Sequence, residues 1–150
     1  MLYISHRGNI TGKDCNRENT IDYINEALSR DFYVEVDIRS FNMRWYLGHD
    51  TPQEEVDNNF LDNKKIFVHA KNSEALLRLT ELNLLCEYFW HNVDDYTLTS
   101  NANVWVYPNK PLLKNSFCVL PEQGYNGNIN LCKGICSDNI DFYKNEQILS

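Results

Sequence analysis

The chain has 150 residues, of which 43% are apolar and 23% are charged, and its formal net charge is −7. This length fits one domain, and the composition is typical of a globular protein with a sizeable core. An acidic chain lacks the basic footprint that neutralises nucleic-acid phosphates, so we expect no nucleic-acid partner.

Targeting segments and cysteine motifs do not stand out either. The chain does not open with a basic segment and a long apolar run, and it contains no 18-residue apolar run. We therefore expect a cytoplasmic protein without a membrane span. The five cysteines have no CxxC spacing, and no histidine completes a zinc pattern around Cys132 and Cys136. Free, mostly buried thiols are the expected state.

Strand and helix patterns alternate along the first third of the chain. A short apolar strand is predicted over 2–5, and apolar residues at helical spacing predict a helix over 19–30. A second strand follows over 32–38, where β-branched and polar residues alternate, and a third is predicted over 44–48. The polar, acidic stretch over 51–65 predicts a loop or a single loose turn.

The later two-thirds contain short strands with less helical cover. A strand over 66–70 leads to a helix that is capped at Asn72 or Ser73 and runs to about residue 85. The stretch 94–101 is too short and polar for a normal helix. The remaining elements are strands over 87–91, 103–107, 117–120 and 133–137, and a partial helix over 140–149.

Eight strands with helices between some of them indicate an α/β fold with a parallel sheet. Functional side chains that follow the strands predict the mouth of a TIM-type (β/α)8 barrel. Such a barrel usually takes about 250 residues. We therefore expect one reduced domain over 1–150, with several helices short or missing. The barrel is then stripped down or open, or a partner subunit in a homo-oligomer covers its bare face.

Chemically capable side chains occupy these strand ends. His6 and Arg7 follow the first strand, Glu35 and Asp37 share the face of the second strand opposite its β-branched residues, and His49 follows the third. Two carboxylates on one strand face can hold a divalent cation, and a guanidinium can bind two phosphate oxygens. Two histidines with pKa near 6.5 can supply the proton transfers that cleaving a phosphodiester requires. The set predicts a metal-assisted phosphate site.

In chain order, these residues resemble the signature of the glycerophosphodiester phosphodiesterase family, within the superfamily of phosphodiesterases similar to phosphatidylinositol-specific phospholipase C. The matching motifs are His6-Arg7-Gly8, Glu18-Asn19-Thr20, Glu35-x-Asp37 and His49-Asp50. Weaker matches are His69-x-Lys71, where the family usually has Glu-x-Lys, and GICSDN over 134–139. The resemblance implies a TIM barrel, a divalent cation, and hydrolysis or transfer at a phosphodiester.

The resemblance also implies roles. It makes His6 and His49 the acid–base pair, Glu35 and Asp37 the metal ligands, with Glu18 and His69 as further candidates, and Arg7 and Lys71 the phosphate-binding groups. Mg²⁺ or Ca²⁺ is the expected ion, and His69 in place of a carboxylate also admits Mn²⁺ or Zn²⁺. Candidates for the walls of the mouth are His91, Trp105, Tyr107, Glu122, Tyr125 and Asp138.

Structural explanations compete with these roles. His6 alone could be a buried core histidine, and Glu18 also suits the first turn of a helix. The strand-2 acids could pair with Arg7, Arg39 or Arg44. Taken together, the motifs favour a phosphodiesterase acting on a small, water-soluble alcohol phosphodiester, by water or by an internal hydroxyl. The alternative is a weak or inactive relative that binds a phosphorylated ligand or a partner protein.

Overall fold

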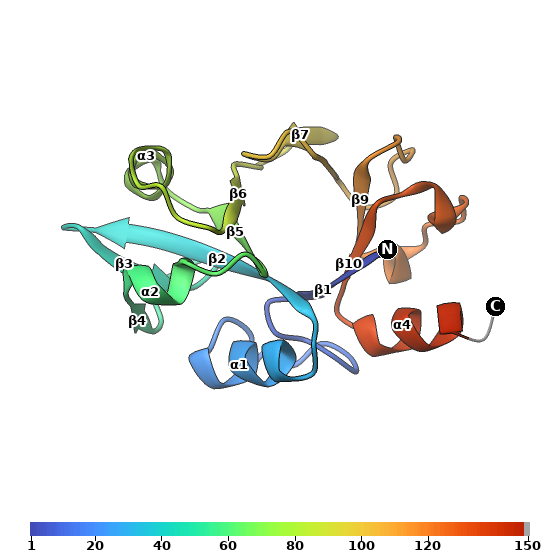
Figure 1. The fold of residues 1–150 in the computed structure, drawn as a ribbon, viewed down its shortest axis with the longest axis horizontal. Coiled ribbons are helices and arrows are strands. Elements are labelled where there is room, and N and C mark those ends of the chain that lie inside the picture. Colours follow the sequence, from blue (N-terminus) through green and yellow to red (C-terminus); the bar gives the residue numbers. More distant parts are fainter. Residues whose placement is uncertain (149–150) are drawn as a thin grey trace.

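The structure is a computed structural model that describes residues 1–148, with side chains through residue 146. It is a mixed α/β fold with ten strands and four α-helices in this range (Figure 1). The strands are β1 (Leu2–His6), β2 (Tyr33–Phe41), β3 (Arg44–Leu47), β4 (Glu55–Val56), β5 (Ile66–Ala70), β6 (Glu87–Phe89), β7 (Tyr96–Leu98), β8 (Val104–Val106), β9 (Ser116–Val119) and β10 (Gly134–Ser137). The helices are α1 (Ile21–Ser29), α2 (Asn58–Leu61), α3 (Ser73–Glu81) and α4 (Ile140–Ile148), and 3₁₀ turns lie at Pro121–Gln123 and Ile129–Leu131.

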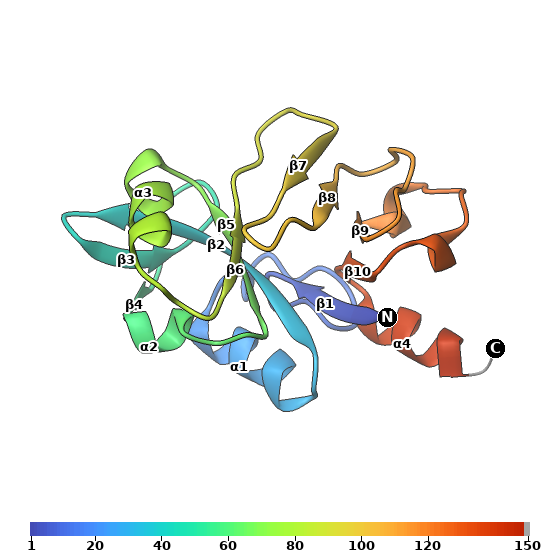
Figure 2. The ribbon, with the colours of Figure 1, turned by 45° about the horizontal axis from the view of Figure 1, so that its top comes forward.

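The strands form a single sheet with a long parallel stretch. Seven strands run parallel in the spatial order β6-β5-β2-β1-β10-β9-β8. Three short strands add antiparallel edges, because β3 pairs with β2, β4 with β3, and β7 with β8 (Figure 2). The parallel stretch brings the carboxyl ends of β1, β2, β5 and β10 to the same edge, where the candidate residues lie.

The third predicted strand does not belong to this parallel series. Its residues form β3, which returns along β2 as the second arm of a hairpin. The hairpin turns at Asn42 and Met43, whose φ angles of 50° and 61° are both positive. Two left-handed residues match the twist of flanking strands in a two-residue turn, and asparagine tolerates that conformation well. The chain therefore reverses where an independent parallel strand was expected.

The sheet curls, so that its end strands β6 and β8 come close together. The Ser100 N–H donates to the Tyr88 carbonyl oxygen at 2.7 Å, and the buried Glu87 carboxylate accepts from Asn103 Nδ2 at 2.6 Å. These contacts connect β6 to the segment before β8, although no β6–β8 ladder is formed within residues 1–148. Figure 1 shows the strands arranged around a common centre.

Aromatic rings from strands on different sides fill that centre. Phe67 on β5 lies 5.2 Å from Phe117 on β9, and Phe89 on β6 lies 4.5 Å from Trp105 on β8, between ring centroids. All four side chains are buried. Because rings from both halves of the sheet meet, one face of the sheet encloses a core of its own. Whether the fold is a reduced (β/α)8 barrel stays a prediction.

The outer face of the sheet carries a second core and the helices. Val34, Val36 and Ile38 of β2 belong to it, together with Ile24 of α1 and Leu79 of α3. Helices α1 and α4 lie outside β2 and β1, and the ion pair between Arg30 and Asp141 joins them (Figure 1). The β-branched face of β2 therefore points to the helices, and its acids point to the other side, opposite the β-branched residues as predicted.

Helical cover is uneven, which agrees with the expectation of short or missing helices. The connections that follow β6, β8 and β9 contain no α-helix within residues 1–148. The stretch 51–65 contains β4 and α2 instead of a plain loop, and 94–101 contains β7. In the part of the chain that the structure covers, no helix is long and apolar enough to cross a membrane.

Two further predictions concern a helix end and the cysteines. Helix α3 ends at Glu81, earlier than predicted, because Leu82 adopts an extended conformation and packs with Leu84 against the outer core. A leucine-rich stretch thus gave a helical pattern beyond the true end.

All five cysteines are free, and four of them are buried, which confirms the expected thiol state. The predicted end of the last helix, at 149, lies outside the described residues.

Candidate functional site

The carboxyl ends of several strands border one cavity of about 220 Å³. One wall consists of polar and charged side chains, and the other is largely aromatic and apolar. The lining residues are His6, Arg7, Glu35, His69, His91, Trp105, Tyr107, Pro108, Val119, Leu120 and Gln123. The cavity is thus lined by seven of the residues singled out from the sequence for catalysis, phosphate, metal or the pocket wall, whereas Asp37 and Lys71 do not line it.

The first of two clusters at this edge is the Asp37 cluster, formed by Glu35, Asp37 and His69. The two acids project from the same face of β2, and His69 stands opposite Asp37 in the β2–β5 register. His69 Nδ1 lies 3.3 Å from Asp37 Oδ1 and 3.8 Å from Glu35 Oε1. One ligand atom from each residue lies within 4.8 Å of the others, so the three can address one ion.

Two oxygens of the Asp37 cluster are unusual, because they are buried and lack a hydrogen-bond partner among the described residues. They are Glu35 Oε2 and Asp37 Oδ1, in residues that are 2% and 0% exposed. A buried carboxylate oxygen without a donor is strongly destabilising. A divalent cation would satisfy both oxygens. The donor set of two carboxylates and an imidazole therefore fits a metal ion.

The other oxygen of Asp37 is held by the protein. Arg7 Nε lies 2.8 Å from Asp37 Oδ2, and Asn19 Nδ2 donates to the same oxygen at 2.9 Å. Asn19 Oδ1 also accepts from the Asp37 N–H at 3.0 Å. Lys71 Nζ is 3.9 Å from Asp37 Oδ1, so both candidate phosphate-binding cations flank this carboxylate. These contacts orient Asp37 without using its inner oxygen.

The two acids of this cluster have opposite pKa shifts. Burial alone would raise the pKa of Asp37, but the contact with His69 and the charge of Arg7 hold it below its usual range. Burial and the nearby charge of Asp37 raise the pKa of Glu35. The cluster therefore holds one firmly ionised carboxylate and one whose charge is poorly compensated by the protein.

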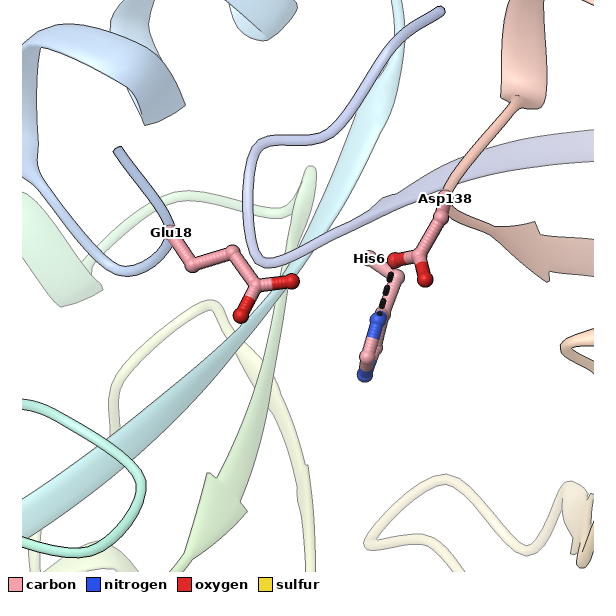
Figure 3. Close-up of side chains that lie close together, drawn as sticks. All are labelled: His6, Glu18 and Asp138. Carbon is pink, nitrogen blue, oxygen red and sulfur yellow. Dashed lines mark hydrogen bonds and ion pairs between the residues drawn. The ribbon is translucent and has the colours of Figure 1, made fainter. Parts of the chain in front are cut away.

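The second cluster is the Asp138 cluster, formed by His6, Glu18 and Asp138 (Figure 3). His6 Nδ1 lies 2.6 Å from Asp138 Oδ1, as the dashed line in Figure 3 shows. The buried Asn9 joins the two acids, since its Nδ2 donates to Glu18 Oε1 at 2.7 Å and to Asp138 Oδ1 at 2.8 Å. These oxygens already have protein donors, unlike Glu35 Oε2 and Asp37 Oδ1 in the Asp37 cluster.

Asp138 is itself held in place by hydrogen bonds that involve Glu122 and Ser137. Glu122 Oε1 accepts from the Asp138 N–H at 2.8 Å, and Ser137 Oγ donates to Glu122 at 3.0 Å. The sequence singled out Glu122 and Asp138 as pocket walls, but neither lines the cavity. The structure places Asp138 against His6, and Glu122 under Asp138.

The His6 ring is oriented by this network. An ionised carboxylate only accepts hydrogen bonds, so His6 Nδ1 carries the hydrogen in its contact with Asp138. The other ring nitrogen, Nε2, faces Glu35 Oε2 at 3.8 Å. Burial would lower the pKa of His6, but the hydrogen bond to Asp138 and the charge of Glu35 outweigh it and raise the pKa. His6 is thus an oriented base facing the cavity, and the explanation as a mere core histidine does not account for its position there.

His49 is less well placed. Its Nδ1 lies 2.7 Å from Asp50 Oδ1, its side chain is 39% exposed, and it does not line the cavity. Arg39 Nη2 donates to the His49 carbonyl oxygen at 2.6 Å and fixes the loop after β3. The hydrogen bond with His49 lowers the pKa of Asp50. The positive charges of Arg7 and Lys71 contribute to this shift.

The pairing of the β2 acids with Arg39 or Arg44 is contradicted. Arg44 pairs with Glu55 on β4, and Arg39 holds the His49 loop. Arg7 is the partner of Asp37, so that alternative is realised at the site itself. Glu18 accompanies the Asp138 cluster and contacts Arg7 Nη1 at 3.5 Å, instead of joining the β2 acids.

The opposite wall comes from β6 and β8. His91 packs edge-to-face on Tyr107 with ring centroids 5.5 Å apart, and Trp105 lies beneath them in the aromatic core. His91, Trp105 and Tyr107 were all expected at the mouth. Asn9 was missed, because an asparagine in a polar loop carries no pattern that distinguishes a buried hydrogen-bonding side chain from one in an exposed turn.

Comparison of the chain with protein-family models, curated proteins and solved structures found no match.

Proposed function

We propose that this chain is a metal-dependent phosphodiesterase that cleaves a small alcohol phosphodiester. The observation that carries the proposal is the pair of unpartnered buried oxygens on Glu35 and Asp37. Glu35 lines the same cavity as His6 and Arg7, and Asp37 lies behind it against His69, which also lines the cavity. A cation-ready carboxylate pair, an oriented imidazole and a guanidinium are the groups that phosphodiester cleavage needs. The resemblance to glycerophosphodiester phosphodiesterases supports the same reading.

Each side chain then has a defined task. Glu35, Asp37 and His69 would hold the cation, which would supply positive charge to the phosphoryl oxygens. Arg7 and Lys71 bind those oxygens from the side of Asp37.

The proton transfers fall to the two histidines. His6 Nε2 takes a proton from the attacking water or substrate hydroxyl, while Asp138 holds the resulting imidazolium. His49 returns a proton to the leaving alkoxide from the rim. The products are an alcohol and a phosphomonoester, or a cyclic phosphate when an internal hydroxyl attacks.

The fold and setting of this enzyme are part of the proposal. The curled parallel sheet with its filled centre supports a reduced (β/α)8 barrel. Free cysteines support a cytoplasmic location. The bare connections after β6 and β8, with Val93 and Leu98 largely exposed, support a homo-oligomer. A monomer in sedimentation at micromolar concentration would contradict that last element.

The test is hydrolysis of bis(p-nitrophenyl) phosphate after removal of metal and readdition of Mg²⁺, Ca²⁺, Mn²⁺ or Zn²⁺. We expect at least one ion to restore turnover, and His6→Ala to lower it by about 10²–10⁴-fold, as is usual for a general base. Lys114→Ala, at an exposed position that does not line the cavity, serves as the control. Absence of turnover with every ion, or full activity of His6→Ala, would refute the proposal for generic diesters.

The position of His49 favours one alternative, a weak or inactive relative that binds a phosphorylated ligand. Its side chain is directed to Asp50 and is partly exposed, so the second proton-transfer group is not assembled at the cavity. Calorimetric binding of glycerol phosphate in the presence of metal, combined with no turnover of any diester, would support this alternative.

A further inference from the structure

His69 presents a particular ring nitrogen to the two carboxylates. Its Nε2 lies 2.8 Å from the carbonyl oxygen of His91. A carbonyl oxygen only accepts, so Nε2 must carry a hydrogen. The nitrogen that remains is Nδ1, and it faces Asp37 Oδ1 at 3.3 Å and Glu35 Oε1 at 3.8 Å. The backbone at the end of β6 thus selects the atom of His69 that enters the cluster.

Something positive must lie between Nδ1 and these oxygens. With Nε2 protonated, a neutral ring directs the lone pair of Nδ1 at two carboxylates, which is repulsive unless a cation or a second ring proton intervenes. Donors about 2.1 Å from a common ion lie roughly 3.0–3.4 Å apart at octahedral to tetrahedral angles. The separations in the cluster are close to this range, so an ion fits with small side-chain movements.

We propose that the site selects Zn²⁺, a divalent ion of borderline softness, through coordination by His69 Nδ1, and disfavours Ca²⁺ and Mg²⁺. Imidazole nitrogen suits Zn²⁺, whereas Ca²⁺ and Mg²⁺ prefer oxygen ligands. Asp37 Oδ1, which is buried and unpartnered, and Glu35 Oε1 complete a set of one nitrogen and two carboxylates. The inference rests on the metal site of the proposed function, and it does not depend on the reaction.

The competing explanation is an imidazolium. In that case Nδ1 also carries a hydrogen and donates it to Asp37, and His69 is a fixed positive charge that takes the place of a metal. The two explanations differ in one observable property, because only the first leaves Nδ1 free to bind an ion.

Histidine nitrogen NMR on the full chain distinguishes them directly. Addition of Zn²⁺ to the metal-free protein is expected to shift the Nδ1 resonance of His69 while Nε2 keeps its hydrogen. An Nδ1 resonance that stays that of a protonated nitrogen at saturating Zn²⁺ would overturn the inference. This measurement uses the unaltered protein, so it does not depend on the folding of a variant.

Calorimetry with variants tests the selectivity. We expect the wild type to bind Zn²⁺ at least about 100-fold more tightly than Ca²⁺, and His69→Glu to reduce this ratio at least tenfold by supplying a third carboxylate. His91→Ala is the matched histidine control, since the carbonyl oxygen that orients His69 is retained, and its ratio should stay that of the wild type. An unchanged ratio in His69→Glu would overturn the inference.

These outcomes are separable from the fate of the proposed function. If hydrolysis depended on Mg²⁺ and Zn²⁺ did not shift the Nδ1 resonance of His69, the proposed phosphodiesterase function would be supported and the metal inference would be refuted. If Zn²⁺ shifted the Nδ1 resonance but no diester were turned over, the metal inference would be supported and the proposed function would be refuted.

Discussion

Two clusters of acids and histidine lie on either side of Arg7, and they differ in what completes them. In the Asp138 cluster, the carboxylate oxygens of Glu18 and Asp138 accept from the Asn9 amide, and His6 is bonded to Asp138. In the Asp37 cluster, Glu35 and Asp37 each keep a buried oxygen without a donor among the described residues. Similar residue types therefore have two different settings: the protein supplies hydrogen-bond donors to one cluster, and we propose that an ion completes the other.

The comparison shows that composition alone does not identify a metal site. Both clusters contain a histidine and two acids whose ligand atoms lie within 4.8 Å of one another. What separates them is the hydrogen-bond inventory, since a donor-saturated carboxylate has little to gain from a cation. The unsaturated cluster is the candidate metal site, and the saturated one orients a base.

The largest expected effect is on metal affinity, and it separates the clusters directly. Asp37→Asn should lower the affinity for Zn²⁺ by more than about 100-fold, because even groups outside the ligand set commonly contribute 10–100-fold. Glu18→Gln, in the other cluster, should stay within about tenfold of the wild type. Isothermal titration of both variants measures this, and an equal loss in Glu18→Gln would show that the clusters form one metal site.

A smaller effect, of opposite sign in the two clusters, is expected on the stability of the metal-free protein. Glu35→Gln should raise the free energy of unfolding at neutral pH by about 1 kcal/mol, because it removes a buried charge whose burial raises its pKa. Asp138→Asn should lower it by about 1–3 kcal/mol, because it breaks a charged hydrogen bond to His6. Urea unfolding measures both, and two changes of the same sign would contradict the distinction.

Much of the Asp37 cluster could be predicted from the sequence, because local rules determine it. Strand alternation places Glu35 and Asp37 on the face opposite Val34 and Val36, and the next parallel strand supplies His69. Asp138 required a longer-range rule. It lies beside His6 because β1 pairs with β10, with Ser5 opposite Ser137, and local alternation does not reveal that the first and last strands are neighbours.

The position of His49 could not be predicted in the same way. The motif His49-Asp50 looked like another strand end at the mouth, but β3 is the return arm of a hairpin that turns at Asn42 and Met43. That turn depends on which residues accept a left-handed backbone, and methionine gives no such signal. The hairpin turn therefore determines the direction of β3 and the exposure of His49, and the strand pattern does not reveal that turn.

The Asp138 cluster should also show a pH dependence of defined sign. The folded-state pKa of His6 is raised, so the stability that its pairing with Asp138 supplies is fully present below about pH 6.5. It is lost as the pH rises through the raised value. The stability difference between the wild type and Asp138→Asn should therefore shrink as the pH rises above neutrality. Urea unfolding of both proteins across this range measures it, and a difference that grows with pH would contradict the assignment.

The smallest effect is expected at the other histidine–carboxylate pair, which has nearly the same length but a different setting. His49 Nδ1 and Asp50 Oδ1 are 2.7 Å apart, against 2.6 Å for His6 and Asp138, yet the Asp50 side chain is 89% exposed and that of Asp138 is 14% exposed. Water competes for an exposed pair and screens its charges, so Asp50→Asn should leave the melting temperature close to that of the wild type. Calorimetric melting of the two asparagine variants side by side is the measurement. If Asp50→Asn destabilised the chain as much as Asp138→Asn, the distance between the groups, and not the hydrogen-bonded setting, would determine what such a pair contributes.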